Sequence, residues 1–100
     1  MQAEFSIKKQ KTGSFLLTAK GDLNVQYAPL LKDNLLKLYS HEGELSVSLQ
    51  AVESIDVAAI QLLLSFKRVC KQSDRIASIK WPETKPLIDL LDKTGISLVF

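Results

Sequence analysis

The sequence holds one histidine, His41, and one cysteine, Cys70, side chains that often act as a general base and as a nucleophile. Catalysis by such a pair requires the base to lie beside the nucleophile. His41 falls in a polar turn between a predicted helix and a predicted strand, where we expect a solvent-exposed loop residue. Cys70 occupies an apolar helical position, where a buried thiol behaves as a small hydrophobic group and is a poor nucleophile. The two residues therefore predict no catalytic pair.

Other kinds of reactive site also lack a signature in the sequence. It contains no metal-ligand cluster and no glycine-rich loop with the spacing of a P-loop or a dinucleotide-binding fingerprint. The 13 basic and 11 acidic residues are spread along the chain, whereas nucleic-acid-binding proteins concentrate basic residues on one face. We therefore expect a non-enzymatic protein that has no cofactor and does not bind nucleic acid.

The composition predicts a single domain, residues 1–100, in a reducing compartment. Hydrophobic residues make up 46% of the chain and charged residues 24%, which is typical of globular proteins, and this length can bury one core. A lone cysteine cannot form an internal disulfide. The sequence has neither an apolar run long enough for a membrane span nor the pattern of a signal peptide. We expect a cytoplasmic protein that does not insert into a membrane.

The hydrophobic periodicity predicts an α/β fold with the element order β-β-α-β-α-β-α-β. The predicted strands cover residues 4–9, 15–20, 45–49, 76–81 and 96–100. The predicted helices cover residues 27–38, 57–72 and 84–94. The first two strands form a hairpin, and the last three, each joined by a helix, should lie parallel through right-handed crossovers. The expected architecture is a mixed sheet of about five strands with three helices packed on it.

The helix predicted over residues 57–72 carries the main functional signal. At 100° per residue, its core arc consists of Ala59, Leu62, Leu63, Phe66, Val69 and Cys70. The opposite arc is polar except for three residues at spacing i, i+3 and i+7, which we call the apolar stripe: Val57, Ile60 and Leu64. Polar side chains rim the stripe: Gln61, Lys67, Arg68 and Lys71.

The apolar stripe has two interpretations. A rotated or wedged helix would bring the stripe into a second part of the core. Alternatively, the stripe is an exposed docking surface, in which a few apolar anchors carry most of the binding energy. Burying three such side chains would contribute about 1.5 to 3 kcal/mol each before the entropy of association is subtracted.

Several motifs occur in a characteristic order along the chain. They are Lys20-Gly21-Asp22-Leu23 after the second strand, the stretch 49–60 with Ile55-Asp56 at the helix entry, and Thr94-Gly95-Ile96 before the terminal Phe100. With the order of elements, these motifs make nearly the whole chain resemble the STAS domains, the family of anti-sigma factor antagonists. The resemblance implies a regulatory module that binds a partner through the long helix and the loop before it.

In the switchable members of this family, a hydroxyl at the start of the helix is phosphorylated, and the phosphate blocks the partner. The resemblance places Ala58 at this phosphoacceptor position, after a retained Asp56. Further departures from the family pattern are Ala59 at the glycine position and Asn24 and Ser48 at two carboxylate positions. A methyl group cannot accept phosphate, and we expect the nearby Ser54 to be a loop hydrogen-bond donor. We therefore predict that phosphorylation does not switch this domain.

The resemblance leaves two functions open. The first is a regulatory module that binds an anti-sigma factor or kinase, or a signalling protein of the chemotaxis-associated kind. The second is a cytoplasmic STAS subunit of a lipid-transporting ABC complex, bound to the transporter ATPase through a larger, obligate interface. The predicted partner-binding residues are the same for both: Ser54, Asp56, Val57, Ala58, Ile60, Gln61, Leu64 and Lys67.

Overall fold

The computed structural model describes residues 2–82 of the chain. Within these residues, four strands form one mixed sheet in the order β1-β2-β3-β4. The strands are β1 (Glu4–Lys9), β2 (Phe15–Leu23), β3 (Leu45–Ile55) and β4 (Ala77–Lys80). β1 pairs antiparallel with β2, whereas β2, β3 and β4 are parallel. The predicted hairpin and the predicted parallel pairing of β3 with β4 are therefore confirmed.

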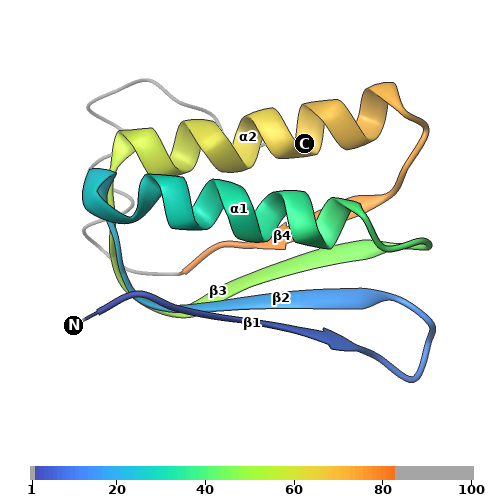
Figure 1. Ribbon diagram of the computed structural model, residues 1–100, viewed down its shortest axis with the longest axis horizontal. Coiled ribbons are helices and arrows are strands. Elements are labelled where there is room, and N and C mark those ends of the chain that lie inside the picture. The colour runs from blue at the N-terminus through green and yellow to red at the C-terminus, as the bar shows by residue number, and fades with distance from the viewer. Residues whose placement is uncertain (1, 83–100) are drawn as a thin grey trace.

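Two α-helices lie side by side on one face of this sheet, α1 (Ala28–Tyr39) and α2 (Val57–Gln72), as Figure 1 shows. A short 3-10 helix, η1 (Val25–Tyr27), leads directly into α1. Pro29 lies in the first turn of α1, where its missing N–H leaves no helical hydrogen bond unmade. Each helix follows a parallel strand, so the two helices start at the same end of the sheet (Figure 1).

The described residues contain four strands and two α-helices, rather than the expected five and three. The third predicted helix, 84–94, and the fifth predicted strand, 96–100, lie outside the described residues. Within them, β2 and β3 run further than the periodicity indicated, to Leu23 and Ile55. The pairing survives because register shifts accommodate Gly21, whose φ of 84° suits glycine.

The core fills the space between the helices and the sheet. Its buried residues are apolar side chains from the inward positions of β2 and β3 together with one face of each helix. They are Leu17, Ala19, Leu23, Leu31, Leu35, Leu38, Leu45, Val47, Leu49, Val52, Ala59, Leu63, Phe66 and Cys70. The alternation along the two strands places polar residues on the opposite face of the sheet.

Arg75 closes the end of the molecule opposite the helix N-termini. Its guanidinium donates to the backbone carbonyls of Tyr39 (2.5 Å), His41 and Gly43 (3.1 Å) and stacks over the Tyr39 ring. The His41 ring stacks on Phe15, with 4.1 Å between the ring centroids. His41 is therefore half-buried, which corrects the expectation of a solvent-exposed loop residue. These contacts give both His41 and Arg75 a structural role.

Candidate functional site

The loops that follow β2 and β3 meet at the carboxyl ends of these strands, and Asp56 joins them. Its Oδ1 accepts a hydrogen bond from Ala59 N at 3.0 Å, which caps α2 as predicted. Its Oδ2 accepts from Val25 N at 2.7 Å, and its own N–H donates to Leu23 O at 3.0 Å. One aspartate therefore orders the helix start and ties it to the loop after β2.

Ser54 makes a second link between the same two strands. Its hydroxyl donates to Asp22 Oδ1 at 2.8 Å, across 32 residues of sequence. This confirms Ser54 as a hydrogen-bond donor, although it lies in β3 rather than in a loop. Asn24 acts locally, because its side chain accepts from Gln26 N at 3.0 Å and caps η1.

Ala58 occupies the second position of α2, directly after the capped start of the helix. The first turn of a helix presents N–H groups and the positive end of the helix dipole, an environment that favours an anion. Ala58 places a half-buried methyl group there, and the neighbouring Ala59 is buried in the core. The helix start has the electrostatics for an anion, but Ala58 brings no hydroxyl to it.

The structure places most of the predicted partner-binding residues at the surface. Ser54 and Gln61 are exposed, and the half-buried members are Asp56, Val57, Ala58, Leu64 and Lys67. Ile60 is the exception. Its side chain is 0% exposed, so the assignment of Ile60 to a partner-binding surface is wrong.

Ile60 is buried although the helical wheel places it on the arc opposite the predicted core face. Val57 and Leu64, which flank Ile60 on the apolar stripe, are also partly buried, so this side of the helix packs within the molecule. On the other side, Val69, which the periodicity assigned to the core, is 47% exposed, and Leu62 is only half-buried. Ile60 therefore follows the first interpretation of the apolar stripe, in which the stripe reaches a second part of the core. The exposed apolar surface of α2 lies on the side of the helix that faces α1.

Two exposed apolar residues of the segment that follows β2 were not predicted as site residues. Val25, in η1, is 70% exposed, and Leu30, in the first turn of α1, is 45% exposed. Val25 follows a run of turn-forming residues and carries no periodic signal, so only the three-dimensional contact with Asp56 reveals its position.

Two ionisable side chains of α2 have shifted proton affinities. Desolvation, with a smaller effect of the Lys71 charge, lowers the pKa of Lys67. Burial raises the pKa of the Cys70 thiol, and the nearby charge of Arg75 opposes this rise. Cys70 is 0% exposed and is held in its neutral form, which agrees with the predicted buried thiol.

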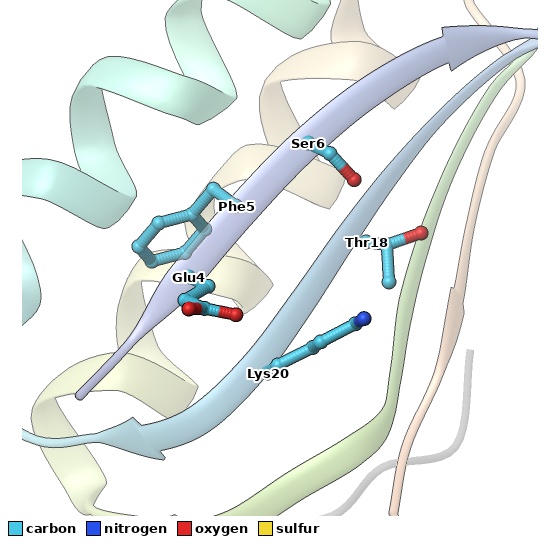
Figure 2. Close-up of a pocket in the computed structure, with 5 residues that line it drawn as sticks. All are labelled: Glu4, Phe5, Ser6, Thr18 and Lys20. Carbon is cyan, nitrogen blue, oxygen red and sulfur yellow. The ribbon is translucent and has the colours of Figure 1, made fainter. Parts of the chain in front are cut away.

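A shallow hollow of about 460 Å³ lies over β1 and β2. Figure 2 shows Glu4, Ser6, Thr18 and Lys20 on one side of the hairpin, while Phe5 points to the other side, toward the helices. Glu4 lies opposite Lys20 in the antiparallel register, and Ser6 lies opposite Thr18. Such cross-strand pairs of opposite charge and of hydroxyls stabilise an open sheet face, which explains this hollow without a ligand.

Among residues 2–82, no three histidine, cysteine, aspartate or glutamate side chains gather closely enough to hold a metal ion. None of the helices in the same part of the chain is long and apolar enough to cross a membrane.

Comparison with known proteins agrees with this fold. The family model described as "Mlab, STAS domain" matches residues 7–97. An anti-sigma factor antagonist from Mycobacterium paratuberculosis has a similar structure, with a TM-score of 0.72 and 20% identity, over 93% of this chain and 82% of that one. No curated protein matches the chain.

Two further solved structures share the fold. The STAS domain of an antisigma-factor antagonist from Rhodobacter sphaeroides gives a TM-score of 0.60 at 10% identity, over 88% of this chain and 90% of that one. The Bacillus cell fate determinant SpoIIAA in its phosphorylated form gives a TM-score of 0.65 at 10% identity, over 92% of this chain and 84% of that one. Identities this low establish similarity of fold only. Because the family model covers almost the whole chain, this protein belongs to the STAS domain family.

Proposed function

We propose that this domain is a non-enzymatic regulatory module of the cytoplasm that binds another protein through the start of α2 and the loop after β2. The observation that carries the proposal is the pair of hydrogen bonds that the Asp56 carboxylate accepts from Ala59 N and Val25 N, which hold these two segments together. They tie the exposed Val25 to Asp56, the residue that directly precedes the half-buried Val57 and Ala58 in the chain. A preorganised surface with apolar anchors and a polar rim suits protein recognition, because little conformational entropy is lost on binding.

The same site supports a module that is always competent to bind. Phosphorylation at the start of α2 would add charge where a partner docks, but Ala58 has no hydroxyl to accept it. The nearest hydroxyl, that of Ser54, is engaged with Asp22. Partner binding is then controlled by the amounts of the two proteins rather than by a kinase acting on this domain.

Two classes of partner fit the proposal. The first is an anti-sigma factor, its kinase, or a chemotaxis-associated signalling protein, by likeness to the antagonist structures. The second is the ATPase of a lipid-transporting ABC complex, with this chain as its STAS subunit. The missing hydroxyl at Ala58 is compatible with both classes, because neither partner would be released by phosphorylation at this position.

Affinity capture with a matched pair of variants tests the binding surface. Ala58→Glu places a negative charge at the helix N-terminus, where the dipole tolerates it, but obstructs the docking surface. Gln72→Glu places the same charge on an exposed residue at the far end of α2. We expect the wild type and Gln72→Glu to retain the same partner, and Ala58→Glu to lose it.

Identification of the retained protein by mass spectrometry then distinguishes the two classes. A sigma-factor regulator or a chemotaxis protein establishes signalling, whereas an ABC ATPase assigns the domain to lipid transport. Equal capture by Ala58→Glu and the wild type would show that the start of α2 is not the binding surface. Mass spectrometry that finds phosphate on residues 54–60 would refute permanent competence.

A further inference from the structure

An apolar groove lies between the two helices. Its volume is about 270 Å³, and it is lined by residues of the two helices alone: Lys32, Leu35, Leu36, Tyr39, Leu62, Ser65, Phe66 and Val69. Leu35 and Phe66 are buried, whereas Leu36 is 59% exposed and Val69 is 47% exposed. The groove therefore has a packed base and two exposed aliphatic walls, one from each helix.

We propose that this groove binds an acidic amphipathic helix of a partner protein. Two packed helices present a channel into which the side-chain ridge of a third helix fits. The groove is smaller than the ~300–1,000 Å³ of a typical small-molecule pocket, and its exposed walls are aliphatic. The groove therefore suits a few aliphatic side chains of a partner helix, at spacing i, i+3 or i+4, and i+7.

Charge determines the kind of helix that fits. The two helices together carry five basic residues and one acidic residue, Asp33. The basic residues are Lys32, Lys37, Lys67, Arg68 and Lys71. The whole chain carries only +2, so positive charge is concentrated on the helix layer. Lys32 lines the groove itself, and Arg68 adjoins Val69 in its wall. A helix with acidic flanks complements this field.

The same charges argue against a second copy of this chain as the occupant. A symmetric dimer formed through the groove would bring the two basic helix layers face to face, because the same patch meets itself across a two-fold axis. The groove also extends along α2 beyond its N-terminal turn and includes none of the residues placed at the start of that helix. The inference therefore does not depend on the proposed function.

Selection from a display library of helical 16-residue peptides tests this proposal. Peptides are selected on the full chain and counter-selected on Val69→Asp. The matched control is Ile76→Asp, because Ile76 is an apolar side chain outside the groove that is 64% exposed, somewhat more than Val69. We expect the enriched peptides to carry apolar residues at helical spacing with Asp or Glu on the flanks. Fluorescence anisotropy should show binding at least about tenfold weaker to Val69→Asp and unchanged for Ile76→Asp and Ala58→Glu.

Charge reversal provides the second arm. The double variant Lys32→Glu and Arg68→Glu should lose the acidic peptides and enrich basic ones from the same library. Enrichment of basic or non-helical peptides on the wild type, or no enrichment, would overturn the proposal. A concentration-dependent dimer in sedimentation that Val69→Asp disrupts would assign the groove to a second copy and would also overturn it.

Discussion

Asp56→Ala should lower the free energy of unfolding by about 2 kcal/mol. Loss of the cap to Ala59 N costs about 1 kcal/mol, the usual effect of replacing an aspartate N-cap with alanine. Loss of the hydrogen bond from Val25 N to the carboxylate costs about another 1 kcal/mol. The second value lies below that of a buried charged hydrogen bond, because water can reach the exposed Val25.

Asp56→Asn separates the two contributions. An asparagine oxygen can still accept from Ala59 N, so the cap is kept. Its amide NH₂ would then face the N–H of Val25, and two donors cannot bond to each other. We expect Asp56→Asn to cost about 1 kcal/mol, roughly half the effect of Asp56→Ala.

Urea unfolding followed by circular dichroism measures both variants, with the wild-type slope as the check that the unfolded state is unchanged. Hydrogen exchange at Val25 N supplies a local measurement, and both substitutions should accelerate it. The reasoning fails if Asp56→Asn and Asp56→Ala destabilise equally, or if Asp56→Ala changes stability by less than about 0.5 kcal/mol, the usual range of neutral surface substitutions.

Three further predictions follow from the packing. Arg75→Lys should lower the free energy of unfolding by about 1 to 3 kcal/mol, because lysine keeps the charge but lacks the planar guanidinium that donates to three carbonyls. An unchanged thermal midpoint would contradict this prediction. Ile60→Ala should lower the free energy of unfolding, measured with urea, by about 2 to 5 kcal/mol, and Leu64→Ala should lower it clearly less. The reverse order would show that Ile60 is not the more buried of the two side chains. Because burial raises the pKa of Cys70, the folded state keeps a proton that the unfolded state loses. Stability should therefore fall as pH rises above the ordinary thiol value of 9.0, a decline that Cys70→Ala should reduce, and rapid alkylation of the native protein would refute the burial.

Local sequence signals predicted the elements well where they rest on periodicity or on a cap. The bounds of α2 agree with the prediction at both ends, because Asp56 is a strong N-cap and the apolar spacing is regular. The strand β2 was predicted too short because Gly21 and Asp22 carry turn propensity, and β3 because its strict alternation stops after Leu49. Pairing with the neighbouring strand overrides this propensity, since β3 supplies the partners for each exposed backbone group.

The sequence by itself determined that α2 begins at a capped aspartate and that Ala58 brings no hydroxyl to its first turn, because both properties belong to single residues and their immediate neighbours. Only the tertiary structure decided which sides of α2 are covered. A wheel shows how apolar residues are arranged around a helix but not how far the helix turns on the sheet, so Ile60 was assigned outward and Val69 inward. The link from Asp56 to Val25 and the groove between the helices join residues about 30 positions apart, and such contacts exist only after the layers have packed.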